Sequence, residues 1–327
     1  MDRLLAVRQL DVCFCSLRSS VHAVRGLSYE LRRGETVGLA GESGCGKTTS
    51  AKALLGLLSS AVVSGELALS PDECYDLSDQ GARSRSLGPL RGRRIALTFQ
   101  EPTAALDPLR RIGGQISEVI GSRGRASRRD APGQARELLF RVGMDDPDAA
   151  FRAYPHEMSG GMRQRAALAI ALACEPDVLI ADEPTTALDG LLQARVLETL
   201  HRTGLESAGA LELITHDLAV LGSFADRIAI MYAGRIVEEA RARELIDCPL
   251  HPYTRSLLAA APTLERRTTS PPAIGRTSAS PRMQDVGCSY APRCPSRVDV
   301  CASQEPEAGE WAPGHRVACW CAGECAS

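Results

Sequence analysis

The chain has 327 residues, and at roughly 150 residues per domain this length indicates about two domains. Apolar residues make up 44% and charged residues 24%, which is typical of a soluble globular protein. This composition excludes a chain disordered throughout, a collagen-like chain and a coiled-coil rod. The 38 basic and 40 acidic residues give a net charge of -2, so no overall basic field points to nucleic acid as a partner.

The basic residues and the cysteines are unusually distributed. Only Lys47 and Lys52 are lysines, and the other 36 basic residues are arginines. Six of the 12 cysteines lie between Cys288 and Cys325. The N-terminal segment lacks the apolar stretch of a signal peptide, and the longest uncharged apolar run, 166–174, is about half a membrane span. We therefore expect a soluble cytosolic chain, in which clustered cysteines need an explanation other than disulfides.

Taken in chain order, the predicted elements alternate between strands and helices. The pattern predicts strands over 7–14, 35–40, 94–99, 178–181 and 211–215. Helices are expected over 47–58 and 191–200, and the stretch 107–174 is helical in pattern apart from a solvated loop at 121–132. Strands over 227–232 and 235–239 are expected to form a hairpin around Ala233 and Gly234. The alternation predicts an α/β fold with a mainly parallel sheet.

The composition changes after Pro262. Residues 266–281 are rich in Ser, Thr, Pro and Arg, which indicates a linker, and the cysteine-rich tail follows it. The sequence has no internal repeat. We therefore expect one catalytic unit with a small appendage, not two units in tandem.

A G-x-x-x-x-G-K-[ST] motif stands between the predicted strand 35–40 and the helix that begins at Lys47. It consists of Gly41, Glu42, Ser43, Gly44, Cys45, Gly46, Lys47 and Thr48. Its glycines let the backbone wrap around phosphates, so that successive N–H groups form an anion nest at a helix N-terminus. Lys47 is expected to reach the β- and γ-phosphates, Thr48 to bind Mg²⁺, and Thr49 to join the nucleotide-binding set, whereas Cys45 contributes its backbone.

Two carboxylates follow the buried strand predicted over 178–181. Asp182 is expected to bind Mg²⁺, and Glu183 is placed to polarise the attacking water as a general base. The alternative is a solvated strand end, which the presence of a phosphate loop makes a poor explanation.

Together with further motifs, these two occur in the order found in the ATP-binding subunits of ABC transporters, which the chain resembles. Gln100 matches the Q-loop, and the segment 159–165, which begins with Ser159, Gly160 and Gly161, matches the signature motif. Asp189 matches the D-loop, His216 the switch histidine, and Phe14 the aromatic residue of the A-loop. Met158 and Met162 depart from the general signature, which is Leu-Ser-Gly-Gly-Gln, but neither change removes a phosphate ligand.

The resemblance implies a P-loop NTPase fold with a mainly parallel sheet, an antiparallel β subdomain and a helical subdomain. It also implies that Gln100 senses Mg²⁺ and the γ-phosphate, and that His216 positions the attacking water. Phe14 would stack on adenine, although an aromatic residue at a strand end is a core residue about as often. Two such chains would pair head to tail, so that the signature segment of one caps the ATP of the other, and Asp189 belongs to the nucleotide-binding set.

Segments outside these motifs are similar to the oligopeptide/dipeptide/nickel importer branch. They are 251–258, which begins His251-Pro252-Tyr253, together with 100–102, 106–108 and 154–157. The resemblance implies a second ABC ATPase subunit, two transmembrane permease subunits, an extracytoplasmic substrate-binding protein, and a peripheral place on the cytoplasmic face of the membrane. It divides the chain into an ATPase domain, 1–245 with a helical subdomain at about 107–174, and an extension, 246–327. The expected cargo is a peptide, with nickel or a metal chelate as options, and the alternative is a soluble ABC ATPase without a transport role.

Four cysteines of the tail have spacings that match the same branch. Cys288, Cys294, Cys301 and Cys319 are separated by five, six and seventeen residues. Some members that resemble this chain carry a [4Fe–4S] cluster on four such cysteines, and four thiolates also suit zinc. A tail without metal stays open as well. Cys321 could replace Cys319 as the fourth ligand, whereas Cys325 is expected to bind nothing.

Overall fold

The protein is described from a computed structural model that covers residues 2–16, 20–70, 72–79, 85–98, 101, 105–122, 129–185, 190–260 and 286–322. The chain divides into two compact units. Unit 1 consists of Met1–Leu5, Leu31–Thr36 and Arg85–Leu213, and unit 2 of Ala6–Glu30, Val37–Ser84 and Ile214–Ser327. No helix within these described ranges is both long and apolar enough to cross a membrane.

Unit 1 contains three neighbouring strands in the order β8-β7-β6. β6 (Ile95–Thr98) runs parallel to β7 (Val178–Asp182), with Thr98 opposite Ala181. Every residue of β7 and of β8 (Ala210–Ile214) is buried. Continuous burial is typical of strands that are covered on both faces, as their mostly apolar sequences predict.

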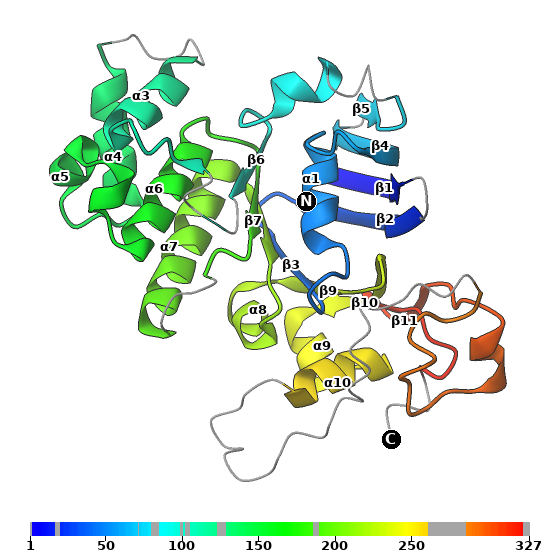
Figure 1. Ribbon diagram of the computed structural model, residues 1–327. Helices are drawn as coiled ribbons and strands as arrows, with labels where there is room; N and C mark the ends of the chain where they lie inside the picture. The colour runs from blue at the N-terminus through cyan, green and yellow to red at the C-terminus, as the bar shows by residue number, and fades with distance from the viewer. Residues whose placement is uncertain are drawn as a thin grey trace. The chain divides into compact units, whose positions relative to one another are not determined.

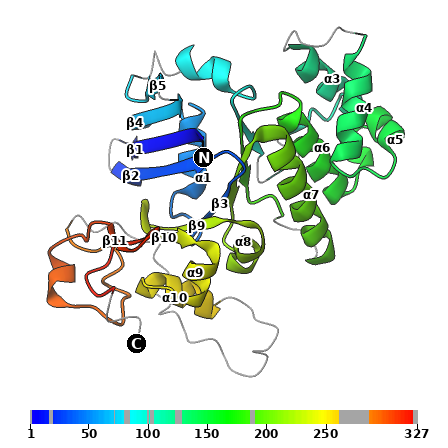
Figure 2. The same cartoon turned by 180° about the vertical axis from the view of Figure 1, so that it is seen from behind.

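Five helices of unit 1 gather in one region of Figures 1 and 2. They are α3 (Ile112–Ser122), α4 (Ala131–Arg141), α5 (Pro147–Arg152), α6 (Gly160–Leu172) and α7 (Gly190–Ala208), with short 3-10 turns η1 (Gly88–Leu90) and η3 (Pro155–Glu157). The packing of α3 on α5 depends on Gly113, because a Cβ there would lie 2.2 Å from the ring of Phe151. Asp146 caps α5 by accepting a hydrogen bond of 2.8 Å from the N–H of Ala149.

Unit 2 contains strands in the order β11-β12-β10-β9-β3. β3 (Thr36–Ala40) runs parallel to β9 (Arg227–Tyr232), and β9 turns back into β10 (Arg235–Arg241) as an antiparallel hairpin. The turn residues Ala233 and Gly234 have φ values of 45° and 86°, the left-handed conformation that a tight hairpin turn needs. β12 (His315–Val317) pairs with β10, and β11 (Gly309–Ala312) pairs with β12. The helices of this unit are α1 (Lys47–Leu54), α8 (Leu218–Phe224), α9 (Ala242–Asp247) and α10 (Pro252–Ala260).

A separate four-stranded sheet has the order β2-β1-β4-β5, and Figures 1 and 2 show its strands side by side. The strands are β1 (Arg3–Cys15), β2 (Ser20–Arg32), β4 (Ala61–Ser70) and β5 (Glu73–Asp76), and β4 is antiparallel to both β1 and β5. A bulge between Arg8 and Asp11 interrupts the register of β1 with β4, and Gln9 has a φ of 48° there.

A buried carboxylate anchors the C-terminal extension to β10. Glu238 is fully buried and accepts hydrogen bonds from the N–H groups of Leu250 (2.7 Å) and His251 (3.0 Å). Nε2 of His315, on β12, lies 2.8 Å from the same carboxylate. Burial lowers the pKa of His251 to about 4, and its Nδ1 accepts a hydrogen bond from the N–H of Tyr253, so this histidine caps α10 in its neutral form.

The expected strands and the 227–239 hairpin are confirmed, whereas β2, β4, β5, β11 and β12 were not predicted from residue patterns. The helix expected over 47–58 ends at Leu54, because Leu55 is its cap residue and Gly56 takes a left-handed φ of 61°. The expected linker, 266–281, lies outside the described residues.

Candidate functional site

The phosphate loop of unit 2 leaves the buried strand β3 and enters α1 at Lys47. Gly41 has a φ of 154°, and a Cβ there would lie 2.2 Å from the carbonyl oxygen of Met231 on β9. Gly46 has a φ of 112°, and a Cβ there would lie 2.3 Å from the carbonyl oxygen of Ala23 on β2. The loop therefore packs against two backbones that only glycine can approach, which supports the motif's expected conformation.

Lys47 lies folded into this loop. Its side chain is buried, and its ammonium donates to the carbonyl oxygens of Gly41 (2.7 Å) and Glu42 (3.1 Å). The ammonium also lies 3.7 Å from Sγ of Cys45, a thiol whose pKa is raised by burial. A single positive charge is thus held among backbone groups at the start of a helix, the arrangement that favours a bound phosphate.

His216 lies at the same end of the strands as the phosphate loop. The N–H of Thr215 donates to the carbonyl oxygen of Leu39 (3.2 Å), two residues before Gly41, and His216 follows with an exposed side chain. Asp217 caps α8 by accepting from the N–H of Ala219 (2.9 Å). Phe14 lies opposite Ala61 near the end of β1, and its side chain is half-buried.

An expected Mg²⁺ ligand and an expected catalytic residue stand at the carboxyl end of β7 in unit 1. Asp182 is buried and ends the strand. Glu183 has a φ of 45°, a left-handed conformation that is uncommon for a residue with a side chain. Such backbone strain occurs where the surrounding structure requires a particular side-chain direction, and functional sites are enriched in it.

The signature segment begins α6. Ser159 is exposed, and its Oγ accepts a hydrogen bond from the N–H of Met162 (3.3 Å), so it caps the helix. Gly160 and Gly161 form the first turn. Arg163 donates to the carbonyl oxygen of Met158 (2.6 Å), which holds the chain entering the helix. The segment thus presents a helix N-terminus on the surface of unit 1.

Gln100 and Asp189 lie outside the described residues. Loop residues 41–49 and His216 belong to unit 2, whereas Asp182, Glu183 and the signature segment belong to unit 1.

Two residues that contact the phosphate loop were missed by sequence reasoning. Tyr253, on α10, and Arg293, in the cysteine-rich tail, both bind Glu42. The His-Pro-Tyr segment and the cysteine spacing drew attention to these regions, but no local pattern connects either residue to the loop.

Five cysteines of the tail lie around one pocket. Cys288, Cys294, Cys301, Cys319 and Cys321 line one pocket beside His251. Among the residues that the structure describes, no three His, Cys, Asp or Glu side chains form a group that could hold a metal ion. The described residues therefore do not by themselves show the iron–sulfur cluster expected from the resemblance, and Cys325 lies outside them.

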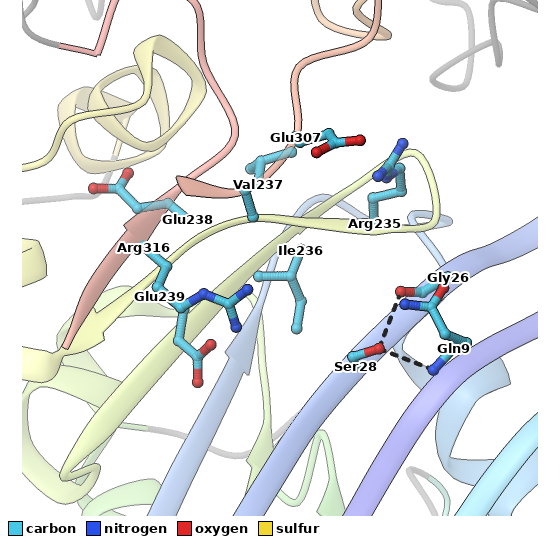
Figure 3. Close-up of a pocket in the computed structure, with 11 residues that line it drawn as sticks. Gln9, Gly26, Ser28, Arg235, Ile236, Val237, Glu238, Glu239, Glu307 and Arg316 are labelled. Carbon is cyan, nitrogen blue, oxygen red and sulfur yellow. Dashed lines mark hydrogen bonds between the residues drawn. The ribbon is translucent and has the colours of Figure 1, made fainter. Parts of the chain in front are cut away.

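A cavity of about 420 Å³ lies elsewhere on unit 2 (Figure 3). Its walls are Gln9, Gly26 and Ser28, the stretch 235–239 of β10, and Glu307, Ala308 and Arg316 of the tail. Ser28 accepts from the N–H of Gln9 (2.9 Å) and donates to the carbonyl oxygen of Gly26. No residue of the phosphate loop lines this cavity.

The chain matches known families in two places. Residues 24–186 match the ABC transporter family, and residues 237–301 match the C-terminal region of oligopeptide/dipeptide transporters. Among solved structures, the bacterial ABC transporter cassette MJ0796 has a TM-score of 0.63 and 25% identity, over 73% of this chain and 99% of its own. cbiO1 from Clostridium perfringens has a TM-score of 0.62 and 25% identity, over 76% of this chain and 92% of its own. The α/β fold with parallel strands, an antiparallel sheet and a group of helices is thereby confirmed.

Similar proteins extend over nearly the whole chain. The probable peptide ABC transporter ATP-binding protein y4tR of Sinorhizobium fredii is 43% identical over 98% of this chain and 95% of its own length. The dipeptide transport ATP-binding protein DppD of Bacillus subtilis is 39% identical, over 98% and 95%. The oligopeptide transport ATP-binding protein OppD of Escherichia coli is 38% identical, over 98% and 93%. The chain therefore belongs to the ATP-binding subunits of ABC transporters, in the oligopeptide and dipeptide importer family.

Proposed function

We propose that this chain binds ATP with Mg²⁺ and hydrolyses it to energise the uptake of peptides across a membrane. The observation that carries the proposal is the phosphate loop, with Lys47 buried among its carbonyl groups at the start of α1. Relatives whose names describe peptide, dipeptide and oligopeptide transport support the class of cargo.

The site residues have separate roles in this proposal. Residues 41–49 hold the phosphates, and Thr48, Asp182 and Gln100 hold Mg²⁺. Glu183 is the general base, His216 and Gln100 contact the γ-phosphate, and Phe14 stacks on adenine. Ser159, Gly160 and Gly161 cap the ATP of a partner subunit, because a helix N-terminus favours a bound phosphate, and Asp189 belongs to the nucleotide-binding set.

The partners follow from the same proposal. The chain pairs with a second ABC ATPase subunit, and the pair docks on two transmembrane permease subunits at the cytoplasmic face of the membrane. An extracytoplasmic binding protein delivers the peptide. Residues 1–245 form the ATPase domain, with a helical subdomain at about 107–174, and residues 246–327 form the extension.

Reconstitution tests this function directly. The full chain is placed in proteoliposomes with its permeases and partner ATPase, and ATP hydrolysis is measured with and without peptide-loaded binding protein. We expect hydrolysis to rise with the loaded binding protein and labelled peptide to accumulate inside. If the rate of hydrolysis is the same with and without the binding protein, and no labelled peptide accumulates, the chain is an ABC ATPase without a transport role.

We also propose that Cys288, Cys294, Cys301 and Cys319 hold a [4Fe–4S] cluster, with Cys321 as a replacement ligand. Their shared pocket supports this, and a cluster would tie down a tail that has few apolar residues. Iron, zinc and acid-labile sulfide are measured on anaerobically purified protein, with Cys301→Ser as the test and exposed Cys248→Ser as the control. About four irons per chain, lost only in Cys301→Ser, are expected, whereas zinc or an iron-free colourless sample refutes the cluster.

A further inference from the structure

Glu42, the second residue of the phosphate loop, is held by the C-terminal extension through both its backbone and its side chain. Its N–H donates to Oη of Tyr253, on α10, at 2.8 Å. Its carboxylate accepts two parallel hydrogen bonds from Arg293, Nη1 at 2.8 Å and Nη2 at 2.7 Å. All three residues belong to unit 2.

The bond to Tyr253 fixes the peptide unit that also binds Lys47. In a planar trans peptide the N–H and the C=O point in opposite directions. The N–H of Glu42 points to Tyr253, and the carbonyl oxygen of Gly41 in the same peptide accepts from the Lys47 ammonium at 2.7 Å. The Tyr253 hydroxyl therefore sets the orientation of a carbonyl group that holds the phosphate-binding lysine.

The bond to Arg293 neutralises a carboxylate at the phosphate loop. The side chains of Arg293 and Glu42 are only 18% and 28% exposed, so solvent screens this pair less than a surface pair. The hydrogen bonds to Glu42 raise the pKa of Arg293, which keeps the guanidinium charged. Without this partner, the Glu42 carboxylate would stand uncompensated where a polyphosphate is to bind, and like charges repel.

The two holding residues are themselves fixed by an aromatic cluster. Tyr253 is buried, and its ring packs against Tyr232 of β9 (4.6 Å between centroids) and Tyr290 of the tail (5.4 Å). The Arg293 guanidinium lies 5.9 and 5.8 Å from the ring centroids of Tyr232 and Tyr290. The core, α10 and the tail thus meet at one point beside the loop.

A second set of ion pairs fixes the tail on the core. Glu305 of the tail pairs with Arg25 of β2 at 2.9 Å and with Arg235 of β10 at 2.6 Å. Ser256 of α10 and Tyr290 of the tail lie within hydrogen-bond distance, 3.1 Å between hydroxyl oxygens. The position of Arg293 is therefore determined by contacts independent of Glu42.

We propose that Tyr253 and Arg293 are positioning residues of the nucleotide site, through which the C-terminal extension sets the affinity of the phosphate loop for ATP. The inference rests on the proposed phosphate-binding role of residues 41–49. The extension is then part of the ATP site, and loosening it weakens nucleotide binding.

Equilibrium binding of a fluorescent ATP analogue to the full chain tests this proposal. The variants are Tyr253→Phe, Arg293→Gln, Arg293→Lys, the double variant Glu42→Gln/Arg293→Gln, and Lys47→Ala. The matched control is Arg297→Gln, since Arg297 is an exposed arginine four residues further along the same tail. Thermal melting of each variant without nucleotide separates affinity from folding.

Arg293→Gln is expected to raise the Kd by at least about fivefold, the lower end of ordinary coupling between sites, and Tyr253→Phe is expected to raise it as well. Arg293→Lys should lie between Arg293→Gln and the wild type, because lysine keeps the charge but loses the fork geometry. The double variant should bind ATP more tightly than Arg293→Gln, because it lacks the Glu42 carboxylate that Arg293→Gln leaves unpaired. Arg297→Gln should bind like the wild type.

The inference is overturned if Tyr253→Phe and Arg293→Gln stay within twofold of the Arg297→Gln control while Lys47→Ala loses binding. Normal binding by Lys47→Ala would instead refute the phosphate loop itself, so the two failures are distinguishable. If Arg293→Gln does not fold, the Kd values of Tyr253→Phe and Arg293→Lys, compared with that of Arg297→Gln, test the proposal. Coupling is reciprocal, so nucleotide should also slow amide hydrogen exchange in residues 286–322 of the wild type, and unchanged exchange there contradicts the proposal.

Discussion

Lys47 is one of two lysines in a chain that otherwise uses arginine for positive charge. Its ammonium lies 2.7 Å from the carbonyl oxygen of Gly41, inside a loop where Gly41 and Gly46 leave no room for a Cβ. A guanidinium is planar and larger than an ammonium, so it cannot occupy this place without displacing the loop. Lysine is therefore required here by shape as well as by charge.

Lys47→Arg should weaken nucleotide binding by about tenfold or more, because hydrogen bonds to charged groups contribute about 1.5–3 kcal/mol. The other lysine supplies the control, since Lys52→Arg, in the last turn of the same helix, should bind nucleotide within twofold of the wild type. Isothermal titration with ATP in the absence of Mg²⁺ measures both. Equal affinities for the two variants would show that the loop does not need a compact cation.

At the scale of elements, Gly113 and Gly114 are neighbours in α3 with opposite surroundings. A Cβ on Gly113 would lie 2.2 Å from the ring of Phe151 on α5, whereas a Cβ on Gly114 would meet nothing within 4 Å. The arginine of α4 that covers the same ring, Arg136, lies 4.0 Å from its centroid and limits its movement. The close approach of α3 and α5 therefore depends on one glycine and not on the next.

Gly113→Ala is expected to destabilise the protein by about 1–3 kcal/mol through overpacking of the α3–α5 contact. Gly114→Ala should stabilise it by about 0.5–1 kcal/mol, because alanine loses less backbone entropy in a helix. Urea unfolding of both variants measures the difference. If both substitutions change the free energy of unfolding in the same direction, this pair of helices adjusts to the added methyl group.

At the scale of the whole molecule, we propose that a second subunit completes the ATP site. The signature segment presents the exposed Ser159 at the N-terminus of α6, and the strained Glu183 stands at the end of β7. If Glu183 is the general base, removing its charge should stop hydrolysis while leaving ATP bound between the subunits.

Glu183→Gln should lower the rate of ATP hydrolysis by about 10²–10⁴-fold, the usual contribution of a general base. With ATP and Mg²⁺, light scattering should show a stable complex of this variant with its partner ATPase subunit, and ADP should not produce it. Adding Ser159→Arg should prevent the complex, because a large side chain blocks the helix N-terminus. Hydrolysis at the wild-type rate in Glu183→Gln would contradict the assignment of the base.

Local patterns predicted much of the fold and part of the candidate site. The hairpin at Ala233 and Gly234, the strands β3, β6, β7 and β8, and the phosphate loop all follow from residue spacing over a few positions. The strands β2 and β4 were not predicted from such patterns. Burial in β2 alternates only from Leu27 to Leu31, and in β4 the neighbours Leu67, Ala68 and Leu69 are all buried.

The sequence by itself determined the phosphate loop, because glycine, lysine and threonine at fixed spacing carry their chemistry wherever a strand leads into a helix. Only the tertiary structure decided what holds that loop. Tyr253 and Arg293 are 211 and 251 positions from Glu42 along the chain. The spacing of residue types specifies contacts between neighbours one or two turns apart. Contacts between residues 211 or 251 positions apart depend instead on how the tail packs against β9 and β10, which no local pattern specifies.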